Sequence, residues 1–258
     1  MPSYRSQPTE FAIQLAQEAG EILQRYSHSR LSQHRKGDGK NDFATEADLA
    51  SEDFLLKQIK QSFLKDAILS EESSPYLSTH SEYTWIIDPL DGTHNFFQGK
   101  YDCGVMIARA TKRFVELAVI YNPFKDVLMV AERGEGVYVN GKRALQIDSE
   151  TASFVADDHG FSPVIREHDL QSTCLHSSVD NALLILMGRK NIYLNATAKV
   201  WDLAPLSLCF EELGLIVKNS YENLFDWQQT HGLVAYPHKY RDIVQDIILY
   251  HSAGRISE

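Results

Sequence analysis

The stretch that decides the fold is residues 85–96, WIIDPLDGTHNF. Its apolar start is typical of a buried strand that presents Asp88, and the proline that follows fixes a turn that brings Asp91 close to Asp88. Gly92 lets the backbone approach a ligand closely, and a helix that begins at Thr93 would direct free N–H groups at an anion. The segment therefore predicts metal-binding carboxylates beside a phosphate-binding backbone.

Acidic residues hold comparable positions elsewhere in the chain. Residues 67–69 are predicted to form a short buried strand that runs into Glu71. Asp48 lies three residues after Thr45, at the capping-box position of a predicted helix, and Asp202 begins another helix. Acidic side chains that cluster without basic partners repel one another, and Mg²⁺ prefers hard oxygen ligands of this kind. The acidic residues therefore indicate a magnesium site.

The pattern of apolar residues divides the chain into two lobes. In the first lobe, helices are predicted over residues 11–26 and from Thr45 onward, and an antiparallel meander follows between residues 103 and 146. The second lobe alternates strands with helices, the strands at 154–156, 192–194 and 233–235 and the helices at 181–187, 202–213 and 241–250. We place the boundary near residues 146–152, which gives lobes 1–148 and 149–258 packed as one compact unit.

Composition excludes several classes of protein. With 258 residues, 43% of them hydrophobic, the chain can form one large domain or two packed lobes. A net charge of −10 disfavours a nucleic-acid partner, because an acidic surface repels phosphates. Cys103, Cys174 and Cys209 form neither a CxxC pair nor a zinc-binding spacing, which predicts reduced thiols in a cytoplasmic protein. No signal peptide and no apolar run near the ~20 residues of a membrane helix is visible, so a soluble protein without a membrane partner is expected.

Four segments, in order, resemble the motifs of one family. Residues 88–96, DPLDGTHNF, resemble the signature of the inositol monophosphatase family. Residues 42–48, 69–73 and 201–204 resemble its D-x-x-T-x-x-D, G-E-E-S and W-D-x-A segments. The resemblance spans about residues 8–218, and four motifs in order are far more specific than one. It implies an α/β (α+β) fold, a layered α-β-α-β-α sandwich of the inositol monophosphatase and fructose-1,6-bisphosphatase type, and a homodimer.

The resemblance also implies roles for individual residues. The family's Mg²⁺ ligands fall at Glu71, Asp88, Asp91, Asp202 and the backbone carbonyl of Leu90. Its catalytic positions fall at Asp48, Thr93 and Glu71, and its phosphate-binding positions at Asp91, Gly92 and Thr93. Two or three Mg²⁺ ions and inhibition by Li⁺ are expected. Such ions neutralise phosphate oxygens and lower the pKa of water, so charge stabilisation and positioning suffice without a covalent intermediate.

Departures from the family motifs bear on the substrate. Asn195 stands where inositol-specific members have a Glu that binds substrate hydroxyls, although Asn can also hydrogen-bond a hydroxyl. Ser177 and Ser178 fall at substrate-contact positions, with helix capping as the other interpretation. Lys36 and Lys40 are both candidates for the basic residue that precedes the first motif, and the sequence does not choose between them.

The function predicted from these residues is hydrolysis of a small phosphorylated metabolite, similar to inositol 1-phosphate, by a Mg²⁺-dependent phosphomonoesterase. Alternative substrates are 3′(2′),5′-bisphosphorylated nucleotides, histidinol phosphate and sugar phosphates. A regulatory binding protein on the same fold is the alternative from another class, and the complete acidic set favours the enzyme. A nucleotide-transfer enzyme would need a full P-loop or a GxGxxG motif, and the sequence contains neither.

Overall fold

The larger of two main sheets is formed by the first half of the chain. The computed structural model describes residues 6–29, 31–35, 43–73, 81–146 and 149–254. The seven-stranded sheet contains, in spatial order, β3 (Ala67–Ser70), β4 (Tyr83–Asp91), β5 (Gly104–Thr111), β6 (Val115–Asn122), β7 (Val127–Glu132), β8 (Gly136–Val139) and β9 (Lys142–Arg143). β3 pairs with β4 in parallel, and β4 to β9 pair antiparallel in sequence order. β5 to β9 form the antiparallel meander that the sequence predicts between residues 103 and 146.

The second half of the chain forms a five-stranded sheet. Its spatial order is β11 (Ser172–Thr173), β10 (Phe154–Ala156), β12 (Ile192–Asn195), β14 (Leu233–Tyr236) and β13 (Ile216–Lys218). β11, β10 and β12 are parallel, and β14 is antiparallel to both of its neighbours. The carboxyl ends of β10, β11 and β12 therefore meet at one edge, where α/β proteins gather ligand-binding loops. A separate pair of short strands, β1 (His34–Arg35) and β2 (Phe43–Ala44), is antiparallel.

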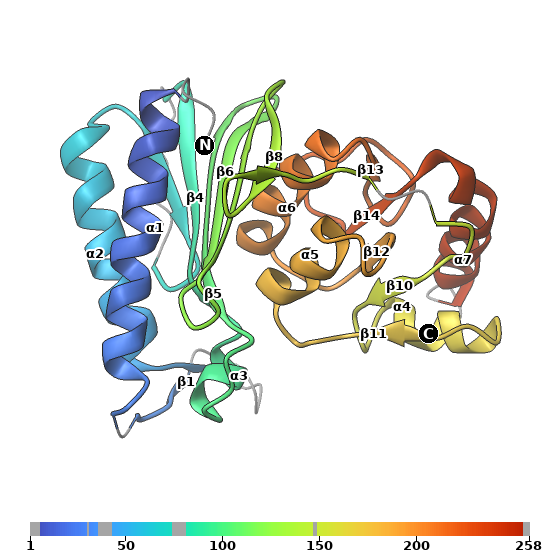
Figure 1. Ribbon diagram of the computed structural model, residues 1–258, viewed down its shortest axis with the longest axis horizontal. Coiled ribbons are helices and arrows are strands. Elements are labelled where there is room, and N and C mark those ends of the chain that lie inside the picture. The colour runs from blue at the N-terminus through green and yellow to red at the C-terminus, as the bar shows by residue number, and fades with distance from the viewer. Residues whose placement is uncertain (1–5, 30, 36–42, 74–80, 147–148, 255–258) are drawn as a thin grey trace.

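Helices cover both sheets and fill the space between them. They are α1 (Gln7–Tyr26), α2 (Glu46–Ser62), α3 (Thr93–Phe97), α4 (Phe161–Glu167), α5 (Ser178–Leu186), α6 (Val200–Glu212), α7 (Arg241–Gly254) and the 3₁₀ helix η1 (His238–Tyr240). α1 and α2 lie on the outer face of the larger sheet, α5 and α6 lie between the sheets, and α4 and α7 lie on the far face of the smaller sheet (Figure 1). This order confirms the predicted α-β-α-β-α layering.

Apolar side chains of the described residues form three clusters: one between α1 and α2 and the larger sheet, one between the two sheets around α5 and α6, and one between the smaller sheet and α4 and α7. β4 contributes to two of them, because Trp85 and Ile87 face α1 and α2 while Ile86 faces α5 and α6. Burial on both faces explains the unbroken apolar run at the start of the signature segment. The middle cluster contains Leu206 and Phe210 of α6 together with residues of both sheets.

Several element boundaries differ from the prediction. α5 begins at Ser178, three residues before the predicted start, because Ser177 rather than a later residue is its N-cap. α4, β11 and β13 are absent from the prediction, since elements of two to seven residues show little periodicity. The predicted boundary near residues 146–152 lies between β9 and β10, and the division into lobes stays a prediction. No helix in the described ranges combines the length and the hydropathy needed to cross a bilayer.

Candidate metal centre and active site

A β-bulge places Asp88 and Asp91 on the same side of β4. Asp88 pairs with Met106 of β5, whereas Asp91 pairs with Gly104, so three steps along β4 match two along β5. In a regular strand, residues three apart point to opposite faces, and the one-residue shift at the bulge reverses that relation. The hydroxyl of Ser51 on α2 donates to the carbonyl of Pro89 at 2.9 Å and so ties the bulge to the helix layer.

Buried Asp88 and Asp91 and partly buried Asp202 form a carboxylate cluster. Each offers an oxygen, and these oxygens all lie within 4.8 Å of one another. Asp88 and Asp91 are 2% and 6% exposed, respectively. Asp202 arrives from α6, where its Oδ2 accepts the Lys199 backbone N–H at 2.9 Å. The sequence prediction that these residues share one site is consistent with this arrangement.

The carboxylates of the cluster have raised pKa values. Burial raises the pKa of Asp88 well above its ordinary range, and the neighbouring Glu71 and Asp202 raise it further. Burial raises the pKa of Asp202 to about 8, with a contribution from Asp91. Burial likewise raises the pKa of Asp91 to about 6, although hydrogen bonds from α5 lower it in part. Buried acids that repel one another in this way fit a hard divalent cation, which would neutralise them and satisfy their oxygens.

Glu71 lies next to Asp88 on the loop that follows β3. Its backbone N–H donates to the carbonyl of Ile87 at 3.2 Å, and its side chain hydrogen-bonds Asp88. Glu52 of α2 holds this loop: its Oε1 accepts the backbone N–H groups of Glu72 and Ser73, both at 3.1 Å. Ser70, at the position of the family's Gly, also donates its hydroxyl to Glu52. Glu52 therefore fixes the loop that presents Glu71.

Asp91 is bound by the N-terminus of α5. The Ser177 hydroxyl donates to Asp91 Oδ2 at 2.5 Å. The backbone N–H of Ser178 donates to Oδ1 and that of Val179 to Oδ2, both at 2.9 Å. The side chain of Ser178 also hydrogen-bonds Asp202. Ser177 and Ser178 thus contact the carboxylate cluster directly, and Ser177 also caps α5.

Partly buried Thr93 and fully buried Asp48 form a hydrogen-bonded pair. The Thr93 hydroxyl donates to Asp48 Oδ1 at 2.8 Å and lies 3.1 Å from the carbonyl oxygen of Leu90. Asp48 is fully buried, and its Oδ2 accepts the Thr45 backbone N–H at 2.7 Å and the Thr45 hydroxyl at 2.6 Å. The capping box that the sequence predicts at Thr45 is present, and it orients Asp48 toward Thr93.

Gly92 is the N-cap of α3 and has a left-handed backbone with φ of +78°. A Cβ at this position would lie 2.7 Å from the carbonyl oxygen of Asp102, which only a displacement of the backbone could relieve. Glycine is therefore required here for two independent reasons, its conformation and its close approach to the neighbouring chain.

Asn195 lies at the end of β12, and its side chain contacts its own loop. Its Oδ1 accepts the backbone N–H groups of Thr197 and Ala198 at 2.9 and 2.8 Å, and its Nδ2 lies 3.4 Å from the Tyr193 hydroxyl. Its contact with a substrate stays a prediction. Lys36 and Lys40 lie outside the described residues.

Sequence reasoning missed the residues that hold this site in place. Glu52 fixes the loop of Glu71, and Asn95 donates through Nδ2 to the carbonyls of Asp102 and Leu175, both at 2.9 Å. A signal for Glu52 was available, because it lies four residues after Asp48 and hence on the same face of the predicted helix. Asn95 lies inside the signature segment, but nothing local points to its distant partners.

The chain is similar in sequence and in fold to known proteins. The model of the inositol monophosphatase family matches residues 5–248. The Nus factor SuhB of Salmonella typhimurium is 28% identical over 238 residues, which cover 87% of this chain and 89% of that protein. The IMPase of Thermotoga maritima superposes with a TM-score of 0.85 at 22% identity, over 96% and 99% of the two chains. An IMPase/NADP phosphatase complexed with Mg²⁺ and phosphate superposes with a TM-score of 0.82 at 19% identity, over 93% and 94%.

Proposed function

The chain belongs to the inositol monophosphatase family, and we propose that it is a Mg²⁺-dependent phosphomonoesterase acting on a small phosphorylated metabolite similar to inositol 1-phosphate. One observation carries this proposal: the cluster of Asp88, Asp91 and Asp202, whose oxygens approach within 4.8 Å of one another. Two buried carboxylates and a partly buried one cannot all be charged at this separation without a large cost, unless a cation neutralises them. The IMPase/NADP phosphatase of the same fold, which was crystallised with Mg²⁺ and phosphate, supports the choice of ion.

The carboxylate cluster would hold two or three Mg²⁺ ions. The ligands would be Glu71, Asp88, Asp91, Asp202 and the carbonyl of Leu90. Bound Mg²⁺ would supply positive charge that neutralises phosphate oxygens and lowers the pKa of water. Li⁺ is expected to inhibit. Ser177 and the first N–H groups of α5 would keep Asp91 in one orientation, so that its oxygens need not reorganise during the reaction.

Thr93 and Asp48 would orient the attacking water. Because the Thr93 hydroxyl donates its proton to Asp48, the lone pairs of its oxygen face outward and can accept a hydrogen bond from water. A proton leaving the water would pass to the Thr93 oxygen while the Thr93 proton moves to Asp48. Thr45 would hold Asp48 in place. The N–H groups of Gly92 and Thr93 would bind the phosphate beside Asp91.

The substrate hydroxyls would meet Ser177, Ser178 and Asn195. Since Asn195 Oδ1 already accepts two backbone N–H groups, Asn195 would serve as a donor through its amide group. A neutral donor fits a substrate hydroxyl less selectively than a carboxylate does. Bisphosphorylated nucleotides, histidinol phosphate and sugar phosphates therefore remain alternatives to inositol 1-phosphate. We also propose a homodimer in which each chain has lobes 1–148 and 149–258, the second lobe providing Asp202.

A second candidate function is regulation through protein partners. The observation that favours it is the name of the curated relatives, Nus factor SuhB, at 28% identity. A regulatory role and phosphatase activity do not exclude each other, because the carboxylate site and the exposed surface are different parts of the molecule.

Phosphate release from a substrate panel tests the proposal. The panel contains inositol 1-phosphate, a 3′,5′-bisphosphorylated nucleoside, histidinol phosphate, fructose 1,6-bisphosphate and glycerol 2-phosphate, each with Mg²⁺ and with chelator. Mg²⁺-dependent release that Asp91→Asn abolishes is expected, and the best substrate identifies the branch. Folded protein that releases phosphate from none of them would overturn the phosphatase and favour the regulatory role.

A further inference from the structure

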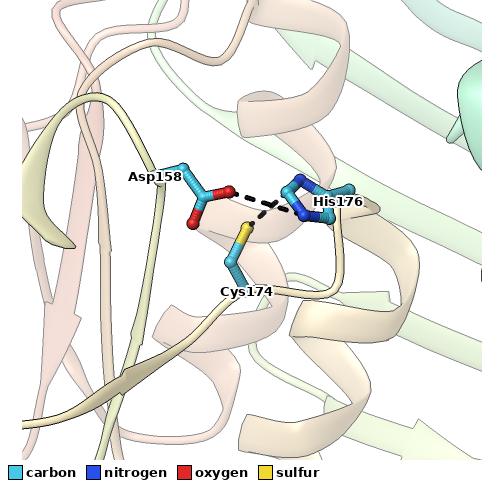
Figure 2. A group of neighbouring side chains, drawn as sticks. All are labelled: Asp158, Cys174 and His176. Atoms are coloured by element: carbon cyan, nitrogen blue, oxygen red, sulfur yellow. Dashed lines mark hydrogen bonds and ion pairs between the residues drawn. The ribbon is translucent and has the colours of Figure 1, made fainter.

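A second group of metal-ligating side chains lies outside the carboxylate cluster. Asp158, Cys174 and His176 point toward one another (Figure 2), and their ligand atoms all lie within 4.8 Å of one another. His176 Nε2 is 3.4 Å from Asp158 Oδ2, and His176 Nδ1 is 3.9 Å from Cys174 Sγ. These two contacts use different ring nitrogens of His176, and an ion shared by the thiol, the imidazole and the carboxylate would bind one of the two.

Strand topology explains why these residues meet. β10 and β11 are parallel neighbours, with Val155 opposite Thr173. Cys174 follows β11 directly, and Asp158 follows β10 by two residues. Because the carboxyl ends of parallel strands lie at one edge of a sheet, the two side chains come together although 16 positions separate them in sequence. His176 completes the group from the turn that leads to Ser177 and α5.

The turn that carries Cys174 and His176 is held in place. Asn95 Nδ2 donates to the carbonyls of Leu175 at 2.9 Å and His176 at 3.3 Å, and the Leu175 N–H donates to Asn181 Oδ1 at 3.0 Å. His176 itself has a φ of +54°, a left-handed conformation that costs about 1–2 kcal/mol for a residue with a side chain. A bulky residue kept at a position suited to glycine points to a use for its side chain.

The group opens into a cavity of about 450 Å³. His94 and His159 line the same cavity, which gives two further imidazoles in its wall. Asp158 and His176 side chains are 45% and 62% exposed, so both can rotate toward a shared ion, while Cys174 is partly buried. We propose that Asp158, Cys174 and His176 form a zinc site that is separate from the magnesium ligands.

The choice of Zn²⁺ follows from the donor atoms. Zn²⁺ binds sulfur, nitrogen and carboxylate oxygen in tetrahedral sites, whereas Mg²⁺ favours oxygen ligands alone. Three protein ligands leave a fourth position open toward the cavity, where water, an imidazole or a donor atom of a small ligand can bind. The site would then lie one residue from Ser177, which contacts Asp91 of the magnesium cluster.

A cysteine–histidine–aspartate nucleophile is the competing interpretation, and the geometry disfavours it. The distance of 3.9 Å between Cys174 Sγ and His176 Nδ1 is longer than a nucleophile–base hydrogen bond. Burial also raises the pKa of the Cys174 thiol, the opposite of what an activated nucleophile needs.

Cobalt binding to the whole chain tests the zinc site. Co²⁺ is added to protein kept in excess Mg²⁺, so that the carboxylate cluster is already occupied. The expected result is one equivalent of Co²⁺ with a thiolate-to-cobalt charge-transfer band, which Zn²⁺ displaces. Cys174→Ser should remove the band, and His176→Ala and Asp158→Asn should each weaken Zn²⁺ binding at least about tenfold. The controls His28→Ala and Asp53→Asn change exposed residues of the same types and should bind like wild type.

A measurement on wild-type protein tests the same site without depending on whether the variants fold. Zn²⁺ should slow alkylation of Cys174 by iodoacetamide, measured by peptide mass spectrometry, and Mg²⁺ should not. The fully buried Cys103 and Cys209 serve as internal references. Absence of the charge-transfer band in wild type, its persistence in Cys174→Ser, or alkylation of Cys174 unaffected by Zn²⁺ would each overturn the proposal.

Discussion

The hydroxyl of Ser177 donates a hydrogen bond of 2.5 Å to Oδ2 of Asp91, and this contact joins the start of α5 to the carboxyl end of β4. Asp91 also accepts the N–H groups of Ser178 and Val179. A carboxylate at a helix N-terminus satisfies donors that have no partner within the helix, and it is stabilised by the helix dipole. The same three bonds fix the orientation of a side chain that we propose as a Mg²⁺ ligand, so one set of contacts would serve both stability and function.

Ser177→Ala should lower both stability and activity. The change removes the N-cap of α5 and the shortest bond to Asp91. Loss of a cap costs about 1 kcal/mol, which corresponds to a fall of about 2–4 °C in the melting temperature of a chain of this size. Thermal melts and phosphate release, with exposed Ser62→Ala as the control, check this. Equal activity in the two variants would show that the Ser177 bond does not orient Asp91.

The metal-free protein should become less stable as pH rises. Burial raises the pKa of Asp91 to about 6 and that of Asp202 to about 8, above the ordinary value of 3.8 that they regain on unfolding. The folded state therefore binds more protons in this range, and the stability from these protons is lost as pH rises through the folded pKa values. With chelator, the melting temperature should fall as pH rises from about 5 to about 8. The difference in melting temperature between protein with Mg²⁺ and protein with chelator should become larger over the same range. A difference that becomes smaller as pH rises would contradict the account.

Asp202→Asn should stabilise the metal-free protein while it weakens metal binding. Because the folded pKa of Asp202 is about 8, this group must take up a proton when the metal-free chain folds near neutral pH, and the substitution removes that cost. Asn keeps an oxygen that can accept the Lys199 N–H. In chelator near neutral pH, the melting temperature should rise by about 2–4 °C. Added Mg²⁺ should raise it less than it raises that of wild type. Exposed Asp53→Asn, measured in parallel, should leave both values unchanged.

Glu52→Gln should raise the Mg²⁺ requirement. Glu52 accepts hydrogen bonds from Ser70, Glu72 and Ser73. In Gln, an NH₂ group replaces one of the two oxygens, and it would face an N–H or O–H group that now donates to Glu52. The loop that presents Glu71 would shift. Loss of such supporting contacts typically costs about 10–100-fold in metal affinity. A Mg²⁺ titration of phosphate release, with exposed Glu21→Gln on α1 as the matched control, measures this. Identical titration curves would exclude a positioning role for Glu52.

Gly92→Ala should be more damaging than Gly99→Ala. Both glycines have positive φ, +78° and +71°, so each substitution incurs a left-handed penalty of about 1–2 kcal/mol. Only at Gly92 would the added Cβ meet the Asp102 carbonyl oxygen, at 2.7 Å, whereas nothing lies within 4 Å at Gly99. Thermal melts of the two variants should therefore separate, with Gly92→Ala lower. Equal melting temperatures would mean that the Asp102 backbone yields freely.

The spacing of apolar residues predicted the long helices and strands well, because the residues that these elements bury recur at regular intervals along the chain. α2 begins after Thr45 with the predicted capping box, and the apolar run before Asp88 forms a strand buried on both faces. β11 has two residues, too few for any period, and the prediction lacks it. The parallel pair β10–β11 was missed for that reason, and with it the proximity of Asp158 and Cys174.

The sequence motifs were sufficient to propose the carboxylate cluster, but not the contacts that hold its side chains in place. Asp88 and Asp91 lie three residues apart, and only the register with β5 reveals the bulge that aligns them. Ser177 meets Asp91 across 86 positions, a contact that no local pattern encodes. Substrate contacts are least predictable from sequence, since the oxygen of Asn195 is already bonded within its own loop.

Phosphate release titrated with Mg²⁺, on the best substrate of the panel, tests the central claim most directly. Wild type and Asp53→Asn should show the same saturable dependence on Mg²⁺, and chelator should abolish release. Asp91→Asn, in which the ion loses a charged ligand, should release phosphate at least about 100-fold more slowly at saturating Mg²⁺. Release by wild type that persists in chelator, or release by folded Asp91→Asn protein at the wild-type rate, would contradict the claim that these carboxylates form the catalytic metal centre.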